Sequence, residues 1–149
     1  MSTILVAHPS PDLYGSDRQL LETIRALVDA GHRVNAALPD DGPLRPELEA
    51  LGARAAIVPF TVLRKSLLSP RGLLGLAARS GGEISRLRAL IKANDADLVL
   101  VNTVTLPWWA PAGRAAGVPV LAHVHEAEDT QNLLVRAGLN APLLAASRV

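Results

Sequence analysis

Residues 118–126 read Val-Pro-Val-Leu-Ala-His-Val-His-Glu, an apolar run that ends in two histidines and a glutamate. A run this rich in valine, entered through a Gly-Val-Pro break, is typical of a strand in a parallel sheet whose two faces are covered by helices. In open α/β sheets, ligands bind beyond the carboxyl ends of such strands. We therefore expect the chemistry of this chain to gather near His125 and Glu126.

Outside that stretch, short apolar runs alternate with helical patterns along the whole chain. Strands are predicted at residues 4–7, 34–38, 56–60, 98–101, 118–124 and 143–147. Helices are predicted at residues 16–31, 44–51, 83–93, 108–116 and 132–137. This alternation predicts an α/β fold, a Rossmann-like doubly wound parallel sheet with helices on both faces. Since all its strands run in the same direction, the first loop, Asn102 and His125 should open on one edge of the sheet.

The composition is typical of one soluble globular domain. Hydrophobic residues make up 49% of the 149 residues and charged residues 19%, so the chain lacks the low hydrophobicity of disordered proteins. With 15 Lys+Arg against 14 Asp+Glu, the net charge is +1, which gives no reason to expect nucleic acid as a partner. The absence of cysteine excludes disulfides, thiolate metal sites and a cysteine nucleophile.

Two further features concern location. The first residues lead directly into an apolar strand without a basic segment, so we expect no secretion signal. No run approaches the roughly 18 to 20 apolar residues of a membrane span. Together with the missing cysteines, these features predict a cytoplasmic protein, or one that is peripheral to the inner face of the membrane.

The loop after the first strand, residues 8–15, is where a nucleotide-binding motif would lie in this kind of fold. A dinucleotide or P-loop motif needs several glycines, and this loop contains only Gly15. Both motifs are therefore excluded. The helix that begins near Gly15 and Ser16 still offers free backbone N–H groups to an anion, although Asp17 competes for the same end. The alternative is that Ser16 and Asp17 only cap the helix.

The histidines of the 118–126 stretch have more than one interpretation. His123 and His125 share one face of a strand, but no further ligand lies at a recognisable spacing, so we expect neither a metal nor a cofactor. His125 is either a buried residue that holds the strand end by a hydrogen bond or a ligand-contacting residue. In the second case Glu126 would orient it or line the cleft.

Two other segments are candidates for contacts with substrate or membrane. Trp108 and Trp109 follow the fourth strand, where one could stack on a sugar and the other pack in the core. Residues 61–82 are rich in leucine and contain no acidic residue. This segment is either a lid on its own domain or a membrane-surface segment whose cations meet lipid phosphates. Its cations are Arg64, Lys65, Arg71 and Arg79.

Four motifs agree with one protein family in their order and spacing. They are residues 10–18, 30–34, 97–103 and 117–126. Together they resemble the amino-terminal domain of retaining, nucleotide-sugar-dependent glycosyltransferases with the two-domain B-type fold, the glycosyltransferase family 4-like group. The resemblance covers nearly the whole chain.

This resemblance implies a set of site residues. It places Tyr14, Gly15 and Ser16 where the family approaches the diphosphate of the donor, and it makes His125 the residue that contacts the donor sugar near the reacting carbon. Glu126 follows this histidine, as in many members of the family. Asn102 and Trp108 lie in the same predicted cleft, and we count them as substrate-binding residues.

The resemblance also implies that a second domain is needed. The carboxy-terminal domain of the family binds most of the nucleotide sugar, and its paired-glutamate motif is absent from residues 1–149. We expect these residues to form an acceptor-side domain that takes part in sugar transfer with retention but is inactive alone. The alternative is a non-catalytic small-molecule or peripheral membrane binding module with the same fold.

Overall fold

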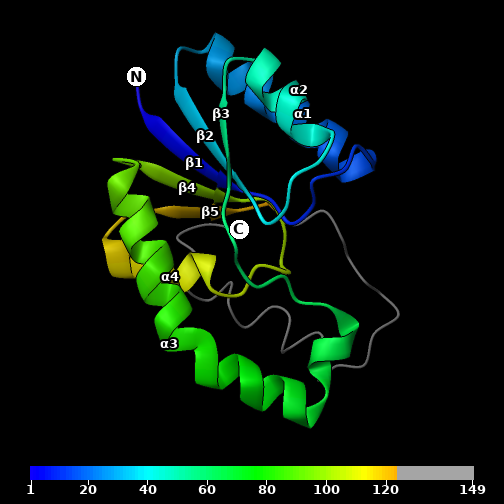
Figure 1. The fold of residues 1–149 in the computed structure, drawn as a ribbon. Helices are drawn as coiled ribbons and strands as arrows, with labels where there is room; N and C mark the ends of the chain where they lie inside the picture. The colour runs from blue at the N-terminus through cyan, green and yellow to red at the C-terminus, as the bar shows by residue number, and fades with distance from the viewer. Residues whose placement is uncertain (124–149) are drawn as a thin grey trace.

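The computed structural model describes residues 1–123 of the chain (Figure 1). The predicted helix at 132–137, the predicted strand at 143–147, and both His125 and Glu126 lie outside the described residues. The strands are β1 Thr3–Ala7, β2 Arg33–Leu38, β3 Arg54–Ile57, β4 Leu98–Val101 and β5 Val120–Ala122. The helices are α1 Gly15–Asp29, α2 Leu44–Ala50, the short 3-10 helix η1 Lys65–Leu68, α3 Pro70–Ala93 and α4 Trp109–Ala116.

The five strands form one parallel sheet in the order β3-β2-β1-β4-β5. Helices α1 and α2 pack on one face, and α3 and α4 pack on the other (Figure 1). The predicted doubly wound α/β fold is therefore confirmed. The chain turns in opposite directions after β1 and after β4, so these two neighbouring strands form the topological switch point, where ligands bind in such sheets.

Helix α1 follows its amphipathic sequence. Leu20 and Ile24 are buried against the sheet, one turn apart. The helix ends at Asp29 with Ala30 as its C-cap, and Gly31 follows with a φ of 84°, a left-handed conformation that favours glycine. Gly31 therefore closes the helix as predicted.

The predicted bounds of two strands were wrong. Strand β3 covers Arg54–Ile57, not residues 56–60, because the chain pairs with β2 directly after the turn at Gly52. Pro59 lacks the N–H group that a longer ladder would need. Strand β5 begins at Val120, not at residue 118, because only the carbonyl of Pro119 takes part, accepting from the Val99 N–H at 3.0 Å.

The predicted start of a helix at residue 83 was also wrong, because residues 61–82 already contain helical structure. These residues form η1 and the first half of α3, which continues without a break to Ala93. The hydroxyl of Ser69 accepts from the Gly72 N–H at 3.1 Å, and Pro70 occupies the first turn, so the helix begins well before residue 83. A Cβ atom on Gly72 would overlap the backbone of Leu67. This glycine therefore permits close packing between η1 and α3.

Candidate functional site

Three buried polar side chains meet at the switch point. His8 directly follows β1, Asn102 directly follows β4, and Asp17 lies in the first turn of α1. Each of the three is at most 3% exposed. Polar groups buried this deeply need hydrogen-bond partners, because an unpaired one costs about 1–3 kcal/mol.

The three side chains form a hydrogen-bonded chain centred on His8. Its Nε2 atom lies 2.6 Å from Asp17 Oδ1, and its Nδ1 atom lies 3.0 Å from Asn102 Nδ2. A carboxylate can only accept, so Nε2 carries a proton and donates to Asp17, and the amide of Asn102 donates to Nδ1. The imidazole is thereby fixed in its orientation by elements from both sides of the switch point.

Asp17 also fixes the first loop. Its second oxygen, Oδ2, accepts from the backbone N–H of Tyr14 at 2.7 Å, so the carboxylate caps the start of α1. The expectation that Asp17 takes part in capping is therefore confirmed, but the expectation for Ser16 was wrong, because the N-cap residue is Tyr14 and Ser16 lies inside the helix. Because the carboxylate faces inward, Gly15 and Ser16 remain exposed at the helix start. The first hydrogen bond within α1 runs from Arg18 N to Tyr14 O. The N–H groups of Gly15 and Ser16 therefore have no acceptor within the helix and point out of its amino-terminal end.

The other predicted site residues divide between surface and core. Tyr14 is exposed, while Trp108 is half-buried directly before α4. Trp109 belongs to the core, where its ring packs edge-on against Phe60 with centroids 5.3 Å apart. The indole N–H groups of Trp108 and Trp109 are both buried and have no partner within the described part of the chain.

The predicted metal candidates are only partly within the described residues. His123 lies just after β5, where its backbone N–H donates to Val101 O at 2.8 Å. Within residues 1–123, no three histidine, aspartate or glutamate side chains are grouped so that they could hold a metal ion.

Asn102 and the first loop were predicted at this edge from the sequence, whereas the central residue, His8, was not. His8 and Asp17 are nine positions apart, and neither position belongs to a known chemical motif. A signal was nevertheless present, because His8 is the first polar residue after β1, just as Asn102 is the first after β4. Equivalent positions on neighbouring parallel strands are expected to meet.

A second feature of the same sheet edge is a cavity of about 240 Å³. It lies between the loops that follow β2 and β3, and it is lined by Pro39, Asp40, Pro59, Phe60, Val62 and Arg64. We call it the edge cavity. Asp40 and Arg64 are exposed and carry opposite charges, and neither forms an ion pair with a residue in the range 1–123. The edge cavity can therefore offer both a carboxylate and a guanidinium to a ligand.

The first loop and the loop after β2 are locked together beside this cavity. The N–H of Leu44 donates to the carbonyl of Pro11 at 2.9 Å. A Cβ atom on Gly42 would lie only 2.6 Å from the same carbonyl oxygen, so only glycine allows this approach. The first loop therefore packs directly against the loop after β2, which forms one wall of the edge cavity.

Comparison with known proteins identifies relatives of this fold. A family model described as "Glycosyl transferase 4-like domain" matches residues 14–148. The crystal structure of Anabaena Alr3699/HepE in complex with UDP-glucose is similar with a TM-score of 0.63 and 20% identity, covering 94% of this chain and 35% of that one.

Two further solved structures share the fold. Acinetobacter baumannii MurG is similar with a TM-score of 0.61 and 16% identity, covering 97% of this chain and 39% of that one. The lipopolysaccharide outer core galactosyltransferase WaaB, in its apo form, has a TM-score of 0.63 and 12% identity, covering 98% of this chain and 38% of that one. This chain thus spans less than two-fifths of each protein. No curated protein matches the sequence significantly.

Proposed function

Because this chain belongs to the glycosyl transferase 4-like domain family and shares its fold with B-type glycosyltransferases, we propose that it is the acceptor-side domain of such an enzyme. The reaction proposed is transfer of a sugar from a nucleotide-sugar donor to an acceptor, with retention at the reacting carbon. HepE was solved with UDP-glucose, which supports a nucleotide sugar as the donor class.

The observation that carries this proposal is the buried chain Asp17–His8–Asn102 at the switch point. It fixes the first loop so that Gly15 and Ser16 present their N–H groups at the ligand-binding edge of the sheet. Such groups suit a diphosphate, because the helix start adds a partial positive charge. In the proposed complex Tyr14 flanks the diphosphate, and Trp108 lines the cleft beside Asn102.

The edge cavity supports an acceptor-binding role for the domain. Its carboxylate at Asp40 can accept hydrogen bonds from sugar hydroxyl groups, and Phe60 offers an apolar surface to the face of a sugar ring. Arg64 would hold an anionic group on the acceptor. Because the edge cavity borders the first loop, an acceptor bound there would lie beside the proposed donor site.

Catalysis requires more than these residues. The leaving diphosphate must be stabilised by cationic and backbone donors, and we place most of them in a carboxy-terminal nucleotide-sugar domain outside this chain. His125 is the proposed catalytic residue, because it would contact the donor sugar, and Glu126 is a proposed substrate contact. We expect residues 1–149 to be inactive alone.

A transfer assay tests the proposal. The whole protein that contains this chain is incubated with a panel of nucleotide sugars and hydroxylated acceptors, and the anomeric configuration of each product is read by NMR. We expect a product with retained configuration from the whole protein and none from residues 1–149 alone. An inverted product would contradict the retaining mechanism, and transfer by the isolated chain would contradict the need for a second domain.

One observation favours a second, peripheral role at a membrane surface. Leu73 and Leu74 lie near the start of α3, where the helix extends away from the sheet (Figure 1). Both side chains are exposed, and Leu74 is 73% exposed. Arg64, Arg71 and Arg79 are exposed in the same segment, and Lys65 is its fourth cation. We propose that the leucines dip into an anionic inner leaflet while the cations meet its phosphates. No helix in residues 1–123 is long and apolar enough to cross a membrane.

Vesicle sedimentation tests this second role. We expect the chain to bind vesicles containing anionic lipid and not purely neutral vesicles. Arg71→Gln should weaken binding roughly fivefold, since one cation near an anionic surface contributes about 1 kcal/mol. Arg88→Gln, which removes an exposed cation farther along α3, is the matched control and should change little. Equal binding to neutral and anionic vesicles would contradict this role.

A further inference from the structure

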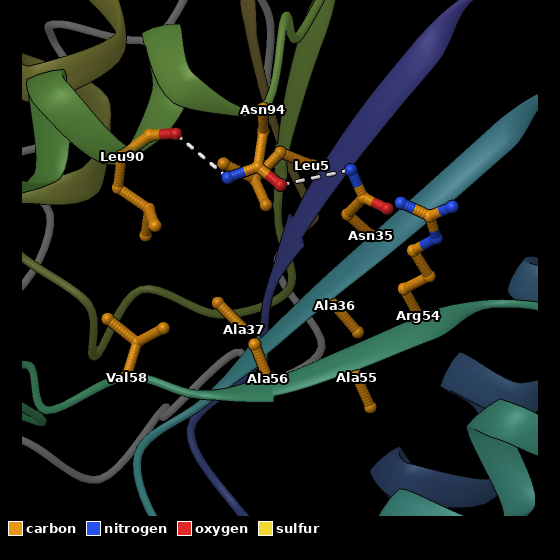
Figure 2. A pocket seen from close by; sticks show the side chains of 10 residues that line it. All are labelled: Leu5, Asn35, Ala36, Ala37, Arg54, Ala55, Ala56, Val58, Leu90 and Asn94. Carbon is orange, nitrogen blue, oxygen red and sulfur yellow. Dashed lines mark hydrogen bonds between the residues drawn. The ribbon is translucent and has the colours of Figure 1, made fainter.

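A second cavity lies on the face of the sheet that α3 covers (Figure 2). Its volume is about 190 Å³, and it is bounded by β2, β3 and the last turns of α3. Ala37 and Ala56 are partners in the parallel register of β2 and β3, and they line this cavity with small side chains. Leu90 of α3 lies across from them. The space remains because two methyl groups stand where larger side chains would fill it.

One end of this cavity, which we call the face cavity, is polar. Asn35 is only 9% exposed, and its Nδ2 donates to Asn94 Oδ1 at 3.0 Å. Asn94 in turn donates from its own Nδ2 to the carbonyl of Leu90 at 2.8 Å. These two bonds fix the orientation of the Asn35 amide, and its Oδ1 atom is left buried without a partner among residues 1–123. A buried acceptor without a donor is rare in native proteins.

A cation stands beside this unpaired oxygen. Arg54 is the partner of Asn35 in the register of β3 and β2, so both side chains lie on the same face of the sheet. Arg54 is exposed and forms no ion pair with a residue in the described part of the chain. Figure 2 shows Asn35 and Arg54 together at one end of the face cavity, with Val58 and Leu90 at the other end.

This arrangement defines the chemistry of an occupant. We propose that the face cavity binds a small carboxylic acid that has a hydroxyl or amino group on the adjacent carbon and a short branched apolar side chain. The carboxylate would pair with the guanidinium of Arg54, and the hydroxyl or amino group would donate to Asn35 Oδ1. The apolar side chain would lie against Ala56, Val58 and Leu90.

The face cavity is separate from the proposed transfer site. Asn35 and Arg54 lie in the amino-terminal halves of their strands, whereas His8 and the edge cavity lie at the carboxyl edge. Its volume is also below the roughly 300–1,000 Å³ of typical ligand pockets. This size favours a single small acid over a whole nucleotide sugar. Binding here can therefore be tested without any measurement of transfer.

The test is an NMR titration of the isotope-labelled 149-residue chain with four related compounds. Leucine and leucic acid carry both polar groups, isocaproic acid lacks the donor, and leucinol lacks the carboxylate. We expect saturable shifts of the Asn35 side-chain amide and the Ala56 backbone amide with the first two compounds. Loss of either polar group should weaken binding about tenfold, because each removes a hydrogen bond that involves a buried or charged partner.

Two variants locate the binding. Ala56→Leu fills the apolar end and should abolish the shifts, and the exposure of Ala56 means that the fold can accept the larger side chain. Ala89→Leu, at an exposed position of α3 outside the face cavity, is the matched control and should bind like the wild type. The proposal is overturned if no compound causes shifts, if Ala56→Leu leaves them unchanged, or if acetate produces them equally.

Discussion

Asp17 accepts hydrogen bonds on both carboxylate oxygens, one from a histidine ring and one from a backbone N–H group. An asparagine has the same size but only one oxygen, and its amide group would meet a donor where the second oxygen had been. We predict that Asp17→Asn lowers the free energy of unfolding by about 1–3 kcal/mol, the penalty for one buried group left unpaired. Chemical denaturation of the chain measures this change.

Asp12→Asn is the matched control, because Asp12 is exposed in the same loop. It should stay within about 0.5 kcal/mol of the wild type, as surface substitutions usually do. If Asp17→Asn were as stable as Asp12→Asn, the buried chain through His8 would not hold the first loop.

His125 allows a second prediction about a single residue, in the whole protein. If it contacts the donor sugar, His125→Ala removes a bond that strengthens as charge develops on the sugar. Turnover should fall by about a hundredfold to a thousandfold, equivalent to about 2.7–4 kcal/mol, while the melting temperature changes little. Turnover and melting temperature are measured on the same preparation.

His32→Ala serves as the control for this substitution. His32 precedes β2 at the opposite edge of the sheet, so its loss should leave turnover unchanged. Wild-type turnover in His125→Ala would contradict the catalytic role. A collapsed melting temperature together with lost turnover would favour the alternative, a buried histidine that holds the strand end.

The effect of a glycine-to-alanine substitution in helix α3 on stability depends on which glycine is changed. A Cβ atom on Gly72 would overlap the backbone of Leu67, whereas a Cβ atom on Gly75 would meet nothing within 4 Å. We predict that Gly72→Ala destabilises the chain by about 1–3 kcal/mol through overpacking. Gly75→Ala should instead stabilise it by about 0.5–1 kcal/mol, because alanine is the better helix former. Thermal unfolding of the two variants gives the comparison, and shifts in the same direction would contradict this explanation.

The same helix shows where sequence reasoning reached its limit. Apolar runs such as residues 98–101 predicted strands well, because a strand that is buried on both faces needs apolar side chains at successive positions. The glycines within residues 61–82 suggested a lid, but one of them, Gly72, allows close packing against Leu67, and that contact depends on the three-dimensional structure. The cap at Ser69 and Pro70 was the local signal of the helix start.

The candidate site was predictable only in part, for a similar reason. Asn102 could be placed at the carboxyl edge because it directly follows an apolar strand. The pairing of His8 with Asp17 depends on how α1 turns back over the sheet, and spacing alone does not specify that. The face cavity was not predicted either, because alanines in a strand reveal nothing about whether a helix fills the space above them.

At the scale of the whole molecule, the chain corresponds to about a third of the length of its solved relatives. The family resemblance predicted from the sequence is confirmed by the match over residues 14–148, and the chain spans 35% of the HepE chain solved with UDP-glucose. Because residues 1–149 would make few contacts with the diphosphate, we predict that they bind a nucleotide sugar with a dissociation constant of about 1 mM or weaker. Titration calorimetry measures this dissociation constant. Micromolar binding would contradict the proposal that a second domain makes most of the contacts with the nucleotide sugar.

Strand β1 lies at the centre of the sheet, with very different distances along the chain to its two neighbours. Leu5 is the register partner of Asn35 on one side and of Val99 on the other, and the Thr3 N–H bonds to Asp97 across 94 positions. During synthesis, therefore, the β1–α1–β2 unit can assemble early while the other edge of β1 stays open until β4 has left the ribosome. An open apolar edge invites pairing between chains. The order in which this domain emerges thus leaves its central strand open to pairing with other chains until β4 has been made.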